Sequence, residues 1–105
     1  MDNIFEKIPE EIKEEVFEVL VSAEHVRIER IVSEGQVTPL GEWLSQDERE
    51  WFILVQGSAE ILFEDDGSRC EMMPGDYVFI ASKRRHRVER TDQNGKTIWL
   101  AVHYK

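Results

Sequence analysis

The sequence predicts an all-β protein, an antiparallel sandwich or barrel of the jelly-roll type. Three observations predict it: about eight short apolar or alternating segments, turn residues between them at near-regular spacing, and no segment suited to a crossover helix. Because parallel strands need long crossover connections, doubly wound folds are excluded. The 105 residues are expected to form one domain. Residues 1–15 would be a helical extension, and about 16–105 the barrel.

The first part of the chain is expected to form a short helical turn, two strands and a long loop. Pro9–Glu15 suits a helix start, with proline in the first turn and acids near the positive end of the dipole. Residues 16–22 are rich in Val, Phe and Leu, and residues 26–32 alternate with the period of a half-buried strand. The loop over 33–46 is long for so small a domain, which favours a functional role.

The central strand is expected over Glu50–Gln56, a continuously apolar run that begins with a carboxylate and ends at Gly57. A charged group at the mouth of such a buried strand needs a partner, a metal or a substrate. Residues 58–64 alternate cleanly, and Asp65-Asp66-Gly67 is a hairpin signal.

Two further turns are indicated by their residues. Pro74-Gly75-Asp76 suits a type II turn, and Asn94-Gly95 suits a hairpin. Strands are expected at 69–72, 77–81, 86–90 and 97–104.

Composition narrows the function classes. A net charge of -9 argues against binding to nucleic acid or to anionic membranes. No apolar run approaches the length of about 20 residues that spans a bilayer. The N-terminus lacks the layout of a signal peptide, so a cytoplasmic location is expected. The basic cluster 83–87 is either a solvated loop or a rim that attracts anions.

Two stretches resemble the motifs of the cupin superfamily. Glu50, six residues and Gly57 match the second half of its first motif, whose first half is a His-x-His pair. Gly75 and His86 match the glycine and histidine of the second motif at the usual separation. The resemblance covers roughly residues 26–104 and implies a small single-domain cupin with a double-stranded β-helix (jelly-roll) barrel. Three positions of the second motif depart from the usual residues: Ala81, Lys83 and Arg90.

The first motif departs further, because Leu44 and Gln46 stand where the His-x-His pair falls. Carried over residue by residue, the resemblance implies a metal ligand set of Gln46, Glu50 and His86. One nitrogen and two oxygens suit Mn, Fe, Ni or Zn, although such a set should hold a divalent transition metal weakly. His103 could add an imidazole.

Each candidate also has a purely structural interpretation. Glu50 could pair with Arg30 or Arg90. Gln46 could be an ordinary polar loop residue, and His86 the end of a charged loop. His103 could be a hydrogen-bonded core histidine. The candidate ligand pocket is completed by four residues: Phe52, Trp99, His103 and Arg90.

The resemblance implies a divalent metal and a small anionic or sugar-like ligand inside the barrel, with dioxygenase or isomerase activity. Without metal, Glu50 or His86 would serve as the base. The alternative is a non-catalytic ligand-binding or sensor module whose metal site has degenerated. A homodimer is also expected, because apolar side chains on both faces of residues 51–55 need covering.

Overall fold

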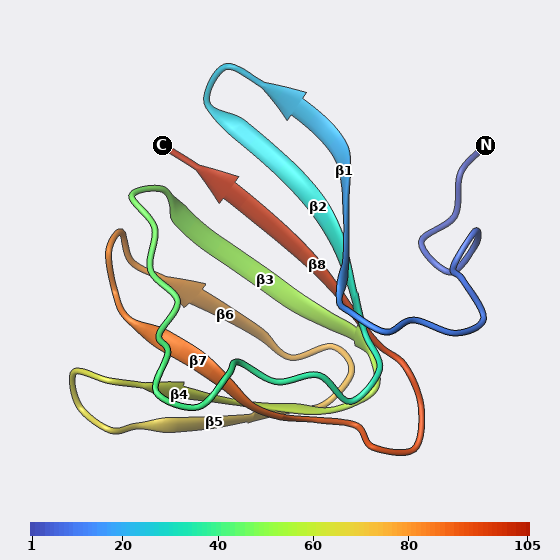
Figure 1. Ribbon diagram of the computed structural model, residues 1–105. Helices are drawn as coiled ribbons and strands as arrows, with labels where there is room; N and C mark the ends of the chain where they lie inside the picture. Colours follow the sequence, from blue (N-terminus) through green and yellow to red (C-terminus); the bar gives the residue numbers. More distant parts are fainter.

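A computed structural model describes residues 1–105 as eight antiparallel strands without a helix (Figure 1). The strands are β1 (Val16–Ala23), β2 (Val26–Ser33), β3 (Arg49–Gln56), β4 (Ala59–Phe63), β5 (Arg69–Met72), β6 (Tyr77–Ile80), β7 (His86–Thr91) and β8 (Thr97–Tyr104). The predicted all-β class is confirmed. No helix is present that could cross a lipid bilayer.

The strands form two sheets that enclose the core. The larger sheet has the order β1-β2-β8-β3-β6 and the smaller one the order β5-β4-β7. Figure 1 shows the larger sheet fanning out above the smaller one, with the β2–β3 loop running along the open side between them. Because β8 lies between β2 and β3, the last strand of the chain joins the two halves of the larger sheet.

The predicted N-terminal helical turn is wrong. Residues 9–15 form bends rather than a helix, because seven residues are too few to stabilise one without tertiary support. The segment is held by side chains instead: the Ile12 amide donates to the Glu34 carboxylate, and the Ser33 hydroxyl donates to Glu15.

The core lies between the two sheets and follows from strand alternation. On β4, Ala59, Ile61 and Phe63 are all buried, as the alternating pattern predicts. They pack against Phe52, Leu54, Met72, Ile80, Trp99 and Ala101. This core positions the inward side chains of β3 and β8 at the end of the barrel where the cavity opens.

Backbone contacts define where β3 ends and how the loop before it is held. Gly57 has φ 93°, and a Cβ atom there would lie 2.5 Å from the Thr97 hydroxyl oxygen, so only glycine fits. Before β3, the Thr38 amide bonds to the Val88 carbonyl, and Leu44 forms a bridge with His86. The long loop is thereby tied to β7, and its residues form one wall of the cavity.

Candidate functional site

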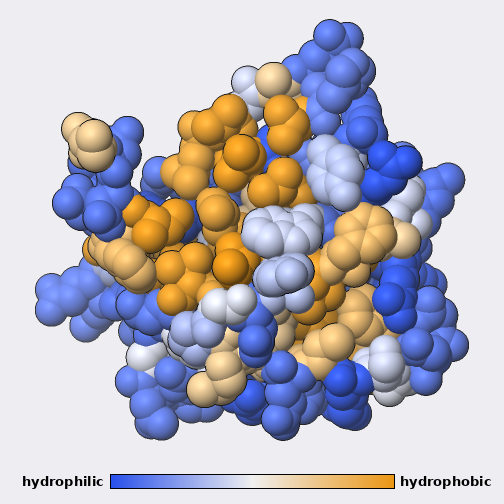
Figure 2. All heavy atoms as spheres, turned by 180° about the vertical axis from the view of Figure 1, so that it is seen from behind, coloured by the Kyte–Doolittle hydropathy of each residue, from blue (hydrophilic) through white to orange (hydrophobic).

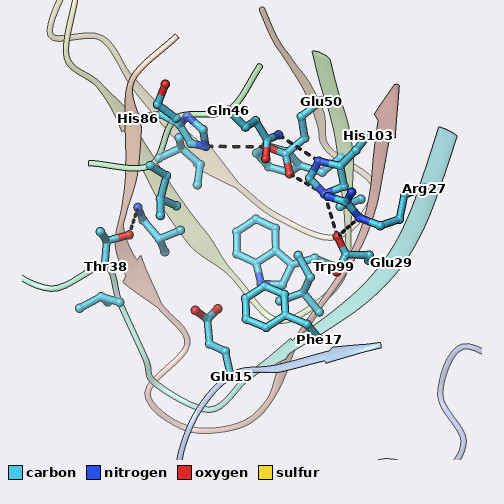
Figure 3. Close-up of a pocket in the computed structure, with 18 of the residues that line it drawn as sticks. Glu15, Phe17, Arg27, Glu29, Thr38, Gln46, Glu50, His86, Trp99 and His103 are labelled. Atoms are coloured by element: carbon cyan, nitrogen blue, oxygen red, sulfur yellow. Dashed lines mark hydrogen bonds and ion pairs between the residues drawn. The ribbon is translucent and has the colours of Figure 1, made fainter. Parts of the chain in front are cut away.

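A cavity of about 340 Å³ opens between the two sheets and the β2–β3 loop (Figure 3). One end is polar and the other is apolar. The polar end consists of Arg27, Glu29, Gln46, Glu50, His86 and His103. The apolar part includes Phe17, Ile31, Phe52, Ile61 and Trp99. The volume is that of a site for a small molecule.

Strand register brings the polar residues together. Arg27, His103 and Glu50 are directly paired across β2, β8 and β3, so they form one row on the inner face of the larger sheet. Glu29 lies two residues along β2 on the same face. His86 comes from β7 in the opposite sheet, and its ring faces Glu50 across the barrel (Figure 3).

Glu50 lies between two imidazoles. Its Oε1 is 3.7 Å from His86 Nε2, and its Oε2 is 3.6 Å from His103 Nε2. Burial, and next the charge of Glu29, raise the pKa of Glu50 to about 7, against a weaker opposing effect of Arg27. A carboxyl group with this pKa is partly protonated and partly ionised at neutral pH.

His103 is fixed on both ring nitrogens. The Gln46 amide nitrogen donates to Nδ1 at 2.9 Å, so the proton of the neutral ring is on Nε2. Nε2 in turn lies 3.1 Å from Glu29 Oε1. Burial, and then the charge of Arg27, lower the pKa of His103, which favours this neutral form.

His86 has the opposite tautomer. Its Nδ1 donates to the Arg84 carbonyl at 3.0 Å, which leaves the lone pair of Nε2 directed at Glu50. Burial lowers the pKa of His86 as well. The neutral Glu50 carboxyl group therefore faces an acceptor in His86 and a donor in His103.

Arg27 and Glu29 are site residues that the sequence motifs did not single out. Arg27 Nε lies 2.9 Å from Glu29 Oε1, and its Nη1 lies 3.3 Å from Glu48 Oε1. The pair holds the Glu29 carboxylate against His103. The only sequence signal was the alternation along β2, which put two charged residues on one strand face without showing that this face points inward.

Most of the predicted site residues lie around this cavity. Six of them line it: Gln46, Glu50, Phe52, His86, Trp99 and His103. Arg90 does not belong to the lining. It is exposed and donates to the Ser58 hydroxyl, because the β-bulge between Glu60 and Ile61 places it on the outer side of β7.

An ion pair of Glu50 with Arg30 or Arg90 is also absent, because neither arginine reaches the inner face. Arg30 is buried on the outer side of β2, where it binds Glu18 and backbone carbonyls of residues 4–7. The buried carboxyl of Glu50 has the two histidines as its partners instead.

The implied metal does not fit the arrangement of these side chains. No group of three or more His, Cys, Asp or Glu side chains is placed to hold a metal ion. His103 Nε2 is directed at Glu29, and Gln46 presents its amide nitrogen rather than its oxygen to the cluster. A metal centre would need three or four lone pairs converging at about 2.0–2.2 Å.

The three arginines of the basic cluster 83–87 are held by local contacts. Arg84 pairs with Asp65 and lies over the Phe63 ring, and Arg85 pairs with Glu64. Arg87 donates to three backbone carbonyls of the β2–β3 loop. These arginines hold loops in place, which removes the support for a rim that attracts anions.

The comparisons agree with this architecture. A family model described as a cupin domain matches residues 30–103. A comparison with curated proteins found no match. Among solved structures, the chain is similar to one from Ralstonia eutropha JMP134 named "putative mannose-6-phosphate isomerase", with 39% identity and a TM-score of 0.95. That match covers 100% of this chain and 97% of the other.

Two further structures share the fold at lower identity. A cupin superfamily protein from Desulfitobacterium hafniense DCB-2 is 16% identical, with a TM-score of 0.74 over 92% of this chain and 83% of that one. An RmlC-like cupin with a double-stranded β-helix fold from Methanocaldococcus jannaschii is 21% identical, with a TM-score of 0.70 over 93% and 86%. The predicted jelly-roll barrel is confirmed, and the chain belongs to the cupin family.

Proposed function

We propose that the protein binds a small, neutral, sugar-like molecule in the barrel and uses Glu50 to move a proton on it. The observation that carries this proposal is the position of the Glu50 carboxyl group, buried at the wall of the cavity between two imidazoles. A general acid or base works best when its pKa lies near the working pH, as that of Glu50 does at about 7.

The charges of the cavity favour a neutral ligand over an anionic one. Three carboxyl groups line it, from Glu15, Glu29 and Glu50, against the single arginine Arg27. Arg27 is already paired with Glu29 and Glu48. A carboxylate or phosphate ligand would therefore lie among like charges without a free cation, which costs more than it gains in a buried site.

The polar end suits a hydroxycarbonyl compound, that is, an open-chain sugar. The ionised form of Glu50 would remove the proton from the carbon that bears the hydroxyl group and is bonded to the carbonyl carbon. The electron pair of that C–H bond would form the carbon–carbon double bond of an enediolate, and the electron pair of the carbonyl bond would move onto its oxygen, which takes up the proton of the adjacent hydroxyl group. Glu50 would then return its proton to the former carbonyl carbon, while the oxygen that gave up its proton becomes the new carbonyl oxygen, which completes an aldose–ketose isomerisation.

The structure from Ralstonia eutropha supports this choice among cupin activities, because it is 39% identical and is named for a sugar isomerisation. Because carboxyl groups outnumber cations in the cavity, its ligand is expected to be a sugar without a phosphate group. Trp99 and Phe17 supply apolar ring surfaces on which the carbon side of a sugar can pack.

Proton exchange in heavy water tests the proposal without a prior choice of product. The protein is incubated in D2O with D-mannose, D-fructose or dihydroxyacetone, and proton NMR follows the loss of the C–H signal next to the carbonyl. Exchange is expected with the wild type and not with Glu50→Gln. A matched control is Glu71→Gln, which removes an exposed carboxylate on the outer face of β5.

A binding module without catalysis is the second candidate. The observation that favours it is the closed arrangement of Glu29, His103 and Gln46, whose polar atoms are satisfied by one another. A rise in melting temperature with these sugars, without deuterium exchange, would select this function. The divalent metal and the cytoplasmic location stay predictions, and metal analysis of the purified protein tests the first.

A further inference from the structure

The far end of the cavity differs chemically from the end that holds Glu50. Figure 3 shows the polar cluster on one side of the cavity, Glu15 and Phe17 on the opposite side, and Trp99 between them. A substrate that presents its hydroxyl and carbonyl groups to Glu50 therefore extends its remaining carbons toward Phe17. Four further apolar residues line this part of the cavity: Ile31, Val37, Ile61 and Val88.

Most polar atoms at the far end already have partners within the protein. Thr38 Oγ1 accepts a hydrogen bond from the Val88 amide at 2.9 Å. The Ser33 hydroxyl donates to Glu15 at 2.7 Å and accepts from the Trp99 indole at 3.4 Å. One oxygen of Glu15 and the hydroxyl hydrogen of Thr38 are left for a ligand. Two sugar hydroxyl groups would bring two donors and at least two acceptors, which these groups cannot satisfy.

Apolar side chains around the mouth of the cavity are in contact with water. Phe17, Val37 and Leu44 all line the cavity and are 60%, 41% and 45% exposed. Covering this surface with apolar ligand atoms is favourable, because both surfaces leave water. A chain of hydroxyl-bearing carbons would lose hydrogen bonds to water when it covers the same surface. The mouth of the cavity therefore favours an apolar ligand segment.

We propose that the substrate is a hydroxymethyl ketone, or the isomeric 2-hydroxyaldehyde, whose remaining carbons form an apolar tail without hydroxyl groups. This narrower class rests on the proposed function, since the hydroxycarbonyl group still lies against Glu50. Glu50 takes a proton from the hydroxymethyl carbon and returns it to the ketone carbon, while the hydroxyl proton passes to the ketone oxygen. The two isomers hold the same atoms, so the reaction needs no co-reactant. The Glu15 carboxylate repels a tail that ends in a carboxylate or phosphate.

The binding of three open-chain ketones tests the tail: erythrulose, ethyl hydroxymethyl ketone and butyl hydroxymethyl ketone. All share the reactive group, and the first two differ only in the two hydroxyl groups of the erythrulose tail. The ethyl ketone should bind at least about tenfold more tightly than erythrulose, because the tail hydroxyls lack partners. The butyl ketone should bind more tightly again, by roughly fourfold for each additional methylene group that is buried.

NMR titration of protein labelled with nitrogen-15 measures these dissociation constants and locates the ligand. The indole N–H signal of Trp99 reports on the cavity. Trp51 lies on the outer face of the larger sheet, because it follows the inward-facing Glu50 on β3. Figure 2, which views the molecule from behind, shows apolar side chains gathered over this outer face. The Trp51 signal therefore reports on adsorption outside the cavity, and it should not shift.

Phe17→Gln tests the contact with the tail, and the exposure of Phe17 lets the fold tolerate the change. The variant should reduce the preference for the butyl ketone over erythrulose, expressed as the ratio of the two dissociation constants, by roughly fivefold. Leu40→Gln is the matched control and should keep the ratio of the wild type. Leu40 is an exposed residue of the β2–β3 loop that does not line the cavity.

Three outcomes would overturn the proposal. One is that erythrulose binds as tightly as the ethyl ketone. Another is that no ketone shifts the Trp99 signal up to about 10 mM, a concentration at which even very weak ligands bind. The third is that the alkyl ketones shift Trp51 and not Trp99. A failure of the proposed function looks different. If the butyl ketone binds with the expected preference but exchanges its hydroxymethyl protons in D2O no faster than with Glu50→Gln, the site for an apolar tail stands and proton transfer by Glu50 is contradicted.

Discussion

Neutralising Glu50 should stabilise the protein in a manner that depends on pH. In the folded state burial raises the pKa of this carboxyl group from 4.5 to about 7. Between these two values the unfolded chain loses the proton while the folded chain keeps it. The free energy of unfolding therefore falls as pH rises through this window, and it is unaffected by Glu50 below it.

The size of the effect follows from the same two values. A difference of about 2.5 pKa units corresponds to roughly 3 kcal/mol at 1.36 kcal/mol per unit. Glu50→Gln cannot ionise and removes this penalty. The difference in the free energy of unfolding between Glu50→Gln and the wild type should thus grow by roughly 3 kcal/mol from pH 4.5 to pH 8. Any effect of the amide group that is independent of pH cancels in this comparison.

Urea denaturation followed by tryptophan fluorescence measures this difference at pH 4.5, 6, 7 and 8. The comparison of two variants is needed because the lowered pKa values of His86 and His103 act in the opposite direction. Neutral buried histidines destabilise the fold as pH falls below 6.5, but they do so in both proteins. A stability difference between Glu50→Gln and the wild type that is the same at pH 4.5 and pH 8 would refute the reasoning.

Three further substitutions test the fold. Gly57→Ala should cost about 1–3 kcal/mol in urea denaturation, because its Cβ would meet Thr97 in a left-handed conformation; an unchanged midpoint would contradict the φ of 93°. Leu54→Ala empties a fully buried position and should cost about 2–5 kcal/mol by the same assay, and a loss below 1 kcal/mol would argue against this core. Arg30→Met removes the donors that hold residues 4–7, so trypsin should cleave after Lys7 at least about tenfold faster, since several charge-assisted bonds are lost. Equal cleavage rates, followed by mass spectrometry, would mean that the segment is held otherwise.

The strands were predictable because the alternation of apolar and polar residues in the sequence agrees with the side of each strand that the fold buries. Residues 58–64 alternate, and the side that the alternation predicts to be apolar is the buried side of β4. The central strand was expected from Glu50 and begins one residue earlier. The helical turn at 9–15 failed because composition alone cannot show that the chain is held by Glu34 and Ser33 instead.

The site was predictable only in part. Motif positions brought Glu50 and His86 to notice, and both line the cavity. Arg27 and Glu29 were missed because apolar residues lie on both faces of β2, so alternation does not show which face points inward. The apolar outer side of that sheet is the physical cause of the ambiguity.

The most direct test of the account is the titration of Glu50 itself. Carbon-13 NMR of protein labelled at the glutamate carboxyl groups would follow each of them against pH. One signal should titrate near pH 7 and be absent in Glu50→Gln, as burial between His86 and His103 requires. If the signal lost in Glu50→Gln titrates near pH 4.5 instead, Glu50 is an ordinary ionised carboxylate, and its role as an acid and base at neutral pH is contradicted.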